Sequence, residues 1–340
     1  MVLAFMLAAL VSNPCPPDSG MAAICGPVAS EDLARIPGTR WLVASGLNIG
    51  TPANLYLVDV RSKRSGVLFP GRMAAIQMQA AFRGHCPGPL RPDRMSLDGL
   101  GIRSGTKDSP VMLLAANHGD RHAIEFFRID LRPDPELTWV GCVPMPAGTL
   151  ANAVVPLADG GMLVSSFHDP RDADAWNRME RGEATGGVWE WHASSGWRLL
   201  TTDGIPGANG IELSADGRTL YVSAWASSQL RVIDRASGAQ RIVPLDFRPD
   251  NIHRAPDGTL LLGGQRAAVR DIAACGAACP QPWLVARFDP ATGNLGTLAS
   301  GSGSKAINYA CGALEVDGEL FMTLRGEPRI AWAPLERRPR

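Results

Sequence analysis

Short apolar runs separated by turn-forming residues recur along the whole chain. Residues 208–245 show the pattern most clearly, with Asp216-Gly217 and Ser237-Gly238 standing between runs rich in β-forming residues. Glycine adopts positive φ without steric cost, so an Asp-Gly or Ser-Gly pair between such runs is a hairpin signal. The segment therefore predicts four antiparallel strands, at residues 210–213, 219–224, 230–234 and 240–245.

Comparable units begin near residues 31, 98, 152, 209, 250 and 309, a spacing of roughly 55 residues. Four-stranded units repeating at about 40–50 residues are typical of β-propellers. Helical periodicity is confined to a patch at Asp172–Arg181. We therefore expect an all-β chain, with one six-bladed β-propeller domain at residues 25–335 and an N-terminal segment at residues 1–24. The blades should be four-stranded and surround a central tunnel.

The start of each repeat is expected to reach one mouth of the tunnel, because the first strand of every propeller blade lines it. Five of the six repeats place a carboxylate or carboxamide there, at Glu31-Asp32, Asp98, Asn152, Asn209 and Asp250-Asn251. Asn and Asp also cap turns at strand starts, but capping does not require one register in five repeats. Hard oxygen ligands without His or Cys are typical of Ca²⁺ sites, so the pattern predicts a calcium ion on the axis.

Four stretches of sequence resemble, in the same order, segments of the paraoxonase/arylesterase family. They are WLVASGL after Glu31-Asp32, LLAANHGDRHAIEFFRID, ANGIELSADGRTLYVSA and RPDNIHRAPDGTLLLGG. More distantly, the chain is similar to gluconolactonases and to strictosidine synthase-like propellers. The resemblance implies a catalytic Ca²⁺ that acts as a Lewis acid on an ester or lactone carbonyl and stabilises the oxyanion. The ligands that it implies are Glu31, Asn152, Asn209, Asp250 and Asn251.

Two departures from the family's pattern concern its second metal site and its catalytic dyad. Asp32 matches one ligand of the family's structural calcium, but Asn152-Ala153 stands where the family has Asn-Asp, so one carboxylate is lost. His118 matches the second His of the family's His–His dyad, and Asp98 stands in place of the first. Asp98 is then either a further calcium ligand or a base that acts through a water at the ion. His118 is either catalytic or structural.

These residues leave three functions open. The first is a calcium-dependent lactonase or arylesterase with a small ester or lactone as substrate. The second is a non-catalytic ligand-binding propeller that keeps calcium for stability. The third is another reaction at the same mouth: sugar-lactone hydrolysis, or a condensation like that of strictosidine synthase, which relies on a tunnel Glu rather than a metal. A serine nucleophile is not expected, because the sequence has no Gly-x-Ser-x-Gly motif.

The charge balance bears on which partners the protein can bind, and the N-terminal sequence bears on the cellular compartment in which it works. Thirty-three basic and 33 acidic residues give a formal net charge of zero, so nucleic acid is not an expected partner. The apolar run Met1–Val11 is shorter than the roughly 20 residues that span a bilayer, and it is similar to the core of a secretory signal. We expect a periplasmic or secreted protein without a stable membrane span, and the sequence leaves its oligomeric state open.

The seven cysteines suit an oxidising compartment and predict one to three disulfides. Cys275 and Cys279 flank a short Gly-containing turn and can close a small disulfide. Cys25 and Cys86 are a second candidate pair, because each precedes a segment expected to face the tunnel. The histidines other than His118 lack metal-ligand spacing and are expected to be structural: His85, His122, His168, His192 and His253.

Overall fold

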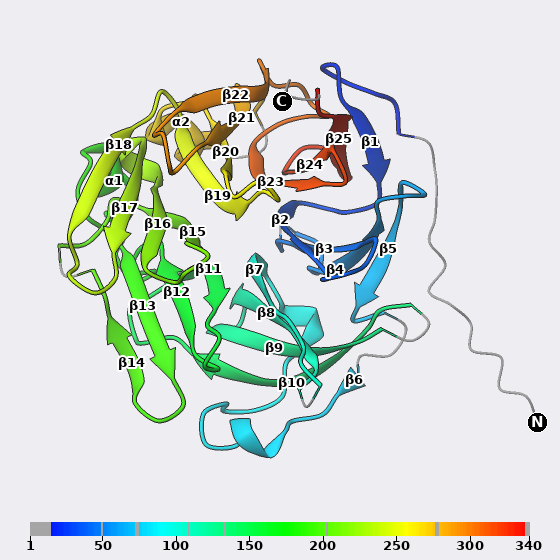
Figure 1. Cartoon of the computed structure of the whole chain (residues 1–340), viewed down its shortest axis with the longest axis vertical. Coiled ribbons are helices and arrows are strands. Elements are labelled where there is room, and N and C mark those ends of the chain that lie inside the picture. The colour runs from blue at the N-terminus through cyan, green and yellow to red at the C-terminus, as the bar shows by residue number, and fades with distance from the viewer. Residues whose placement is uncertain are drawn as a thin grey trace, which may run out of the picture.

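Six sheets stand around one central axis and form the blades of a β-propeller (Figure 1). The computed structural model describes residues 15–48, 50–71, 75–107, 109–131, 134–201, 203–275 and 279–336. Every sheet contains an antiparallel four-stranded unit whose strands are neighbours in the order of the repeat. The expected all-β, six-bladed architecture is therefore confirmed.

The first two blades follow one another in sequence. The first consists of β2 (Ser30–Arg35), β3 (Trp41–Gly46), β4 (Leu55–Asp59) and β5 (Arg64–Phe69). The second consists of β7 (Leu97–Arg103), β8 (Val111–His118), β9 (His122–Asp130) and β10 (Glu136–Pro144). The short strand β6 (Ala75–Ile76) pairs in parallel with β10 and adds a fifth strand to the second sheet.

The next three blades repeat the same meander. The third consists of β11 (Ala151–Pro156), β12 (Met162–Ser166), β13 (Gly187–His192) and β14 (Gly196–Leu199). The fourth consists of β15 (Ala208–Leu213), β16 (Thr219–Ala224), β17 (Gln229–Asp234) and β18 (Gln240–Pro244). The fifth consists of β19 (Arg248–Arg254), β20 (Leu260–Gln265), β21 (Trp283–Phe288) and β22 (Leu295–Gly301).

The sixth blade closes the ring by combining both parts of the chain. It consists of β23 (Ala310–Val316), β24 (Glu319–Leu324), β25 (Arg329–Pro334) and β1 (Ala22–Cys25). The strand β1 pairs antiparallel with β25 as the outermost strand of this blade. Propeller structure therefore begins at Ala22, slightly before the expected boundary at residue 25. Residues 1–14 of the expected N-terminal segment lie outside the described residues.

The helices lie in connections between strands. The helix α1 (Ala175–Glu180) falls inside the predicted patch, whereas α2 (Val269–Cys275) was not predicted. The described residues also form three 3₁₀ turns: η1 (Ala80–Phe82), η2 (Pro92–Arg94) and η3 (Trp225–Ser227). Both α-helices follow the second strand of a blade, so they lie at the tunnel end where the innermost strands begin. Among the described residues, no helix is both long and apolar enough to cross a membrane.

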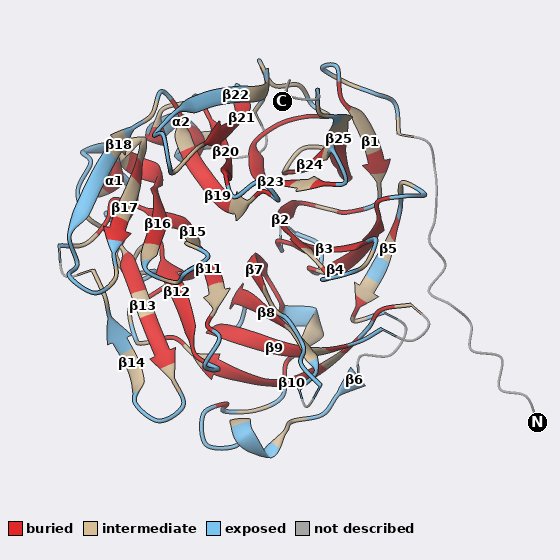
Figure 2. Ribbon diagram, viewed as in Figure 1, coloured by how far each residue is buried: buried red, intermediate tan, exposed pale blue. Residues whose placement is uncertain are grey.

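Burial follows the position of each strand within its blade (Figure 2). All six residues of β3 are buried, because the middle strands of a blade are covered on both faces by neighbouring blades. The outermost strand β18 is largely exposed and carries polar residues such as Gln240 and Arg241. Polar, solvated edge strands of this kind discourage pairing with other chains. The apolar core is thus divided among the spaces between blades.

The cysteine pairing differs in part from the sequence prediction. Disulfides join Cys15 to Cys25, Cys86 to Cys142 and Cys275 to Cys279, which leaves Cys311 as a buried free thiol. The 275–279 pair was predicted, but the suggested pairing of Cys25 with Cys86 is wrong. Cys25 ends β1 in the sixth blade, whereas Cys86 is bonded to β10 of the second blade.

Candidate metal centre

Each innermost strand carries a β-bulge at the same place. In β2, Ser30 pairs with Gly46 and Leu33 with Ala44, so two residues, Glu31 and Asp32, oppose a single residue of β3. The same register shift occurs in the other five blades at Asp98-Gly99, Asn152-Ala153, Asn209-Gly210, Asp250-Asn251 and Cys311-Gly312. A β-bulge interrupts the regular alternation of side chains along a strand. The side chains at the bulge of each innermost strand therefore point in a different direction from those in the rest of that strand.

Hydroxyl groups on the second strand stabilise three of these bulges. The backbone N–H of Asp32 donates to Ser45 Oγ at 3.0 Å, and that of Ala153 donates to Ser165 Oγ at 2.9 Å. The N–H of Gly312 donates to Thr323 Oγ1 at 2.7 Å. A bulge leaves a backbone donor without its partner in the ladder, and burial of that donor alone would be costly. The opposing hydroxyl removes this cost.

Close approach of the neighbouring blade explains two glycines at the second bulge position. A Cβ atom on Gly210 would lie 2.4 Å from the carbonyl oxygen of Asp250, and one on Gly99 would lie 2.6 Å from that of Asn152. Neither distance can hold a side chain, so glycine lets adjacent innermost strands approach each other. The Asp98-Gly99 and Asn209-Gly210 pairs are therefore packing features of the tunnel wall rather than turns.

The first bulge residue of each blade contributes to one buried ring. We call this set the bulge ring; it comprises Glu31, Asp98, Asn152, Asn209, Asp250 and Cys311. All six are buried. Five of them were predicted from the sequence, whereas Cys311 was missed because it breaks the oxygen pattern that identified the others. Its signal was positional only, since it stands at the start of the sixth repeat.

Buried oxygens of this centre have no hydrogen-bond partner among the described residues. They are Glu31 Oε1, Asp98 Oδ1, Asn152 Oδ1, Asn209 Oδ1, Asp250 Oδ1 and Asn251 Oδ1. Buried polar atoms are almost always paired, and a group of unpaired ones calls for an explanation such as an ion. Calcium takes six to eight oxygen ligands, so this donor set fits calcium in both number and chemistry.

Hydrogen bonds on the other polar atoms hold several of these side chains in place. Asn152 Nδ2 donates to Asp98 Oδ2 at 3.2 Å, and Gln265 Nε2 donates to Asp250 Oδ2 at 2.8 Å. Asn251 Nδ2 donates to the backbone carbonyl of Glu31 at 3.1 Å. In each case one polar atom is fixed and the remaining oxygen is left without a partner, as expected for ligands held in advance of binding.

Arg325 provides an internal cation that the sequence analysis did not identify. Its Nε lies 2.6 Å from Glu31 Oε2, and its guanidinium carbon lies 4.6 Å from the centre of the Tyr309 ring. The Glu31 carboxyl is fully buried. Its Oε2 is paired with the charged Arg325, whereas its Oε1 has no hydrogen-bond partner among the described residues. Arg325 directly follows β24 of the sixth blade, and nothing in its sequence context marks it as part of the site.

His118 connects the bulge ring to a cavity. Its Nε2 lies 3.0 Å from Asp98 Oδ2, and the ring lines a cavity of about 460 Å³. The other residues that line this cavity are Leu47, Asn48, Arg94, Ser96, Gly119 and Asp120. The structure thus brings together the two residues predicted as catalytic candidates, at an edge of the centre that adjoins open space.

Burial and like charge control protonation in the centre. Burial, together with the negative charge of Glu31, raises the pKa values of Asp98 and Asp250 well above their ordinary range. Burial also lowers the pKa of His118 to about 4, although the charge of Glu31 acts in the opposite direction. Without a bound cation the surroundings therefore disfavour charge on these three groups. A divalent ion would offset the crowding of the carboxylates.

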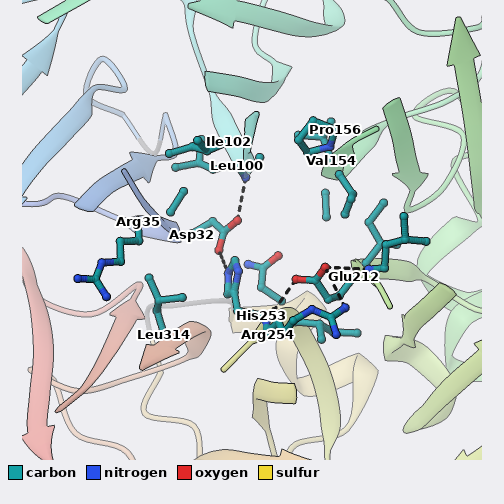
Figure 3. A pocket seen from close by; sticks show the side chains of 18 residues that line it. Asp32, Arg35, Leu100, Ile102, Val154, Pro156, Glu212, His253, Arg254 and Leu314 are labelled. Atoms are coloured by element: carbon teal, nitrogen blue, oxygen red, sulfur yellow. Dashed lines mark hydrogen bonds and ion pairs between the residues drawn. The ribbon is translucent and has the colours of Figure 1, made fainter. Parts of the chain in front are cut away.

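Asp32, predicted as a metal ligand, faces a different part of the tunnel (Figure 3). Its Oδ1 lies 2.6 Å from His253 Nε2, and its Oδ2 accepts a hydrogen bond from the backbone N–H of Leu100 at 2.8 Å. Burial alone lowers the pKa of His253, but the charge and hydrogen bond of Asp32 outweigh it and raise that pKa. Both residues line a cavity of about 390 Å³.

The arrangement around Asp32 does not fit a second calcium site. Both Asp32 oxygens have partners, and a histidine with a raised pKa occupies the position next to the carboxylate. His253 was expected to be structural, and no signal in the sequence linked it to Asp32, which lies in another blade. The ion pair between them supplies positive charge without a metal.

Comparisons with known proteins were made by sequence and by structure. No protein-family model matches the chain, and no curated protein matches it in sequence. A solved gluconolactonase from Xanthomonas campestris is 20% identical, with a TM-score of 0.55 over 93% of this chain and 89% of that chain. A luciferin-regenerating enzyme is 10% identical, with a TM-score of 0.58 over 92% of this chain and 95% of that chain. The chain is thus a six-bladed β-propeller similar in structure, at low identity, to a gluconolactonase and a luciferin-regenerating enzyme.

Proposed function

We propose that the protein is a calcium-dependent hydrolase of lactones or aryl esters. The observation that carries the proposal is the set of buried oxygens without a hydrogen-bond partner among the described residues; one of them belongs to Asp98, which contacts His118 at the edge of a cavity. The structural likeness to a gluconolactonase supports lactone chemistry. The sequence stretches that resemble the paraoxonase/arylesterase family support aryl esters as further substrates.

The proposed ion would be held by side-chain oxygens that have no hydrogen-bond partner among the described residues. The ligands would be Glu31, Asn152, Asn209, Asp250 and Asn251, with Asp98 as a sixth. A calcium ion held by these residues would supply Lewis-acid chemistry, in which the substrate carbonyl is polarised and the charge on its oxygen is stabilised. The ion also compensates the carboxylates whose mutual repulsion, together with burial, raises their pKa values.

His118 is the proposed general base. With Asp98 ionised, the Nε2–H of His118 donates to Asp98 Oδ2, which leaves Nδ1 as the nitrogen that can accept a proton. Burial lowers the pKa of His118 to about 4, so the ring is neutral at neutral pH; the negative charge of an ionised Asp98 beside it would make it a stronger base. A water within reach of the ring would lose a proton to it while attacking the carbonyl carbon. The 460 Å³ cavity has room for a small substrate.

The test is hydrolysis of a small panel of substrates with added calcium and after removal of metal by EDTA. Phenyl acetate and unsubstituted γ- and δ-lactones represent the two proposed classes. We expect turnover that EDTA abolishes and calcium restores. Turnover that EDTA leaves unchanged would contradict the role of the metal. No turnover by protein shown to contain calcium would favour a ligand-binding propeller with a structural ion.

Sugar lactones are the second candidate class of substrate. The cavity beside His118 is lined largely by polar side chains, including Asn48, Ser96 and Asp120, which can bond the hydroxyl groups of a sugar. Adding gluconolactone to the panel separates the candidates. A kcat/KM for gluconolactone that exceeds those for the unsubstituted lactones would identify the sugar lactone as the better substrate.

We also propose that the protein works in the periplasm or after secretion. Its three disulfides support an oxidising compartment, because such bonds are rare where glutathione and thioredoxin keep thiols reduced. Cell fractionation with an antibody against the chain tests this assignment. Recovery in the cytoplasmic fraction alone would contradict it.

A further inference from the structure

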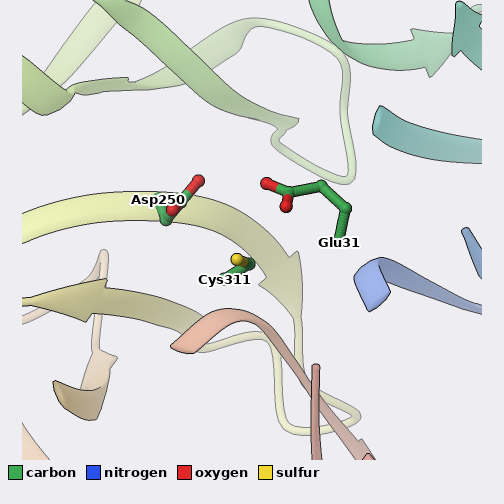
Figure 4. A group of neighbouring side chains, drawn as sticks. All are labelled: Glu31, Asp250 and Cys311. Carbon is green, nitrogen blue, oxygen red and sulfur yellow. The ribbon is translucent and has the colours of Figure 1, made fainter. Parts of the chain in front are cut away.

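The sixth blade contributes sulfur to the bulge ring where the other five blades contribute oxygen. Cys311 occupies the same bulge position in β23 as Glu31 does in β2. Its side chain is fully buried, and Figure 4 shows it facing the same space as the carboxyl groups of Glu31 and Asp250. The thiol therefore belongs to the centre by register as well as by proximity.

The distances allow one ion to contact all three side chains. A donor atom from each of Glu31, Asp250 and Cys311 lies within 4.8 Å of the other two. Two ligands of one ion can be at most about 4.6 Å apart when both bonds are about 2.3 Å long, as for zinc and sulfur. The three donors therefore lie near the range of separations that ligands of one ion can have.

The state of the individual atoms independently favours a ligand role. Glu31 Oε1 and Asp250 Oδ1 are buried without a hydrogen-bond partner among the described residues. The Cys311 thiol makes a hydrogen bond of 3.3 Å to the carbonyl of Tyr309, a weak interaction for a sulfhydryl donor. Arg325 engages Glu31 Oε2, which leaves Oε1 as the atom that this carboxylate can offer.

We propose that Cys311 is a sulfur ligand that lets this centre bind a thiophilic divalent ion, such as Zn²⁺ or Cd²⁺, through Cys311, Glu31 and Asp250. On binding, the S–H bond breaks, its proton leaves to solvent and the sulfur electron pair forms the bond to the metal, so no oxidant or reductant is needed. Calcium prefers oxygen ligands and leaves the thiol protonated. The proposal rests on the bulge ring being the metal centre of the proposed function, but it does not depend on hydrolase activity.

The charges of the side chains around Cys311 are consistent with a divalent ion bound by Cys311, Glu31 and Asp250. A thiolate and the carboxylates of Glu31 and Asp250 carry three negative charges between them. A divalent ion together with the guanidinium of Arg325 balances those charges within the buried site. Thiolate is a soft ligand and selects ions such as zinc over calcium, so the ring offers different donors to different metals.

Absorption spectroscopy with Cd²⁺ tests the proposal in the full-length protein after treatment with EDTA. The other six cysteines are in disulfides, so a thiolate-to-cadmium charge-transfer band can arise only from Cys311. We expect the band to saturate at one ion per chain with release of at least the thiol proton. In C311S the band should vanish and Cd²⁺ affinity should fall by at least about tenfold, the lower end of what loss of a supporting partner costs a metal site. Calcium affinity of C311S should change by less than that.

Two controls make the outcome decisive. In wild-type protein, Cd²⁺ should protect the buried Cys311 from a small alkylating reagent more strongly than Ca²⁺ does at equal occupancy, because only Cd²⁺ removes the free thiol; this comparison needs no variant to fold. D250N should weaken binding of both ions. Cadmium binding without the band, or equal Cd²⁺ affinity of wild type and C311S, would overturn the proposal. A band in protein that hydrolyses no ester would support the sulfur ligand while contradicting the proposed hydrolase.

Discussion

Nε2 of His118 lies 3.0 Å from Oδ2 of Asp98, and the other oxygen of Asp98 has no hydrogen-bond partner among the described residues. The two oxygens of the Asp98 carboxylate can therefore have different roles. Oδ2 can orient His118 beside the cavity, while Oδ1 can serve as a ligand in the bulge ring. The sequence left open whether Asp98 is a ligand or a catalytic group, and this geometry allows one side chain to be a ligand and to position the base.

Replacing His118 by Gln should separate catalysis from metal binding. We expect kcat to fall by about 10²- to 10⁴-fold, the usual contribution of a positioned general base. Calcium affinity should change little, because His118 is not among the residues that offer unpartnered oxygens. Ester hydrolysis and calcium titration of the same preparation measure the two effects. An H118Q variant with wild-type kcat would assign His118 a structural role.

Replacing Asp98 by Asn should affect both properties. The amide keeps the shape of the carboxyl group but lacks the charge that stabilises a protonated His118 and attracts the ion. We expect lower kcat together with calcium affinity that is weaker by about tenfold or more. Hydrolysis measured at saturating calcium separates the two losses. Unchanged calcium affinity with reduced kcat would show that Asp98 acts through His118 alone.

The stability of metal-free protein should depend on Asp250 in a pH-dependent manner. Burial and the charge of Glu31 raise the pKa of Asp250 on folding. A carboxyl with a raised pKa holds its proton more tightly in the folded state, so its contribution becomes unfavourable as pH rises from the unfolded value through the folded one. In EDTA, D250N should therefore match wild type near pH 4 and exceed it in free energy of unfolding at pH 7, by about 1.4 kcal/mol for each unit of raised pKa.

Calcium should reverse this order of stability at pH 7, because the ionised Asp250 of the wild type binds the ion more tightly than the neutral Asn of D250N does. Denaturant unfolding at both pH values, with EDTA and with calcium, gives the four comparisons. Equal stability of D250N and wild type in EDTA at pH 7 would contradict a raised pKa. If calcium stabilised D250N more than it stabilises wild type, that result would contradict the role of Asp250 as a ligand.

Removal of calcium should lower the thermal stability of the whole propeller. Six buried oxygens from five blades have no hydrogen-bond partner among the described residues, so an ion that binds them stabilises the folded state against the unfolded chain. At a free concentration of 100 times Kd, this linkage is worth about 2.7 kcal/mol. Scanning calorimetry with calcium and with EDTA measures the shift in Tm. An unchanged Tm over a wide range of calcium concentration would argue against a specific site.

Alanine at Gly210 should disturb the centre through the backbone. Its Cβ would lie 2.4 Å from the carbonyl oxygen of Asp250, so the innermost strands of the fourth and fifth blades must move apart. We expect a loss of about 1–3 kcal/mol in the free energy of unfolding, with weaker calcium binding. Gly296→Ala is the matched control, since that glycine lies in β22 with nothing within 4 Å. Similar losses in both variants would indicate a general effect of replacing glycine in a strand.

The fold and most of the bulge ring could be predicted because both follow from repetition. Asp98, Asn152 and Asn209 stand at the start of successive repeats, and the propeller converts equal register into spatial convergence. The same reasoning missed Cys311, because the argument depended on residue chemistry and the sixth repeat changes that chemistry. Sequence register alone would have pointed to this position.

Other features depend on contacts between blades and carry no local signal. His253 reaches Asp32 across the tunnel, and Arg325 reaches Glu31 from the neighbouring blade. Such pairs are set by how the blades stand around the axis, which is fixed only once the ring has closed. The Cys25–Cys86 pairing failed for the same reason, since β1 joins the sixth blade rather than a blade beside Cys86.

The most direct test of the central claim is to remove metal from the protein and add calcium back while measuring bound calcium and hydrolysis of phenyl acetate and a δ-lactone. We predict that the stripped protein is inactive and that activity rises in proportion to occupancy until one ion is bound per chain. Hydrolysis that persists in protein free of calcium, or calcium occupancy without any turnover, would contradict a calcium-dependent hydrolase.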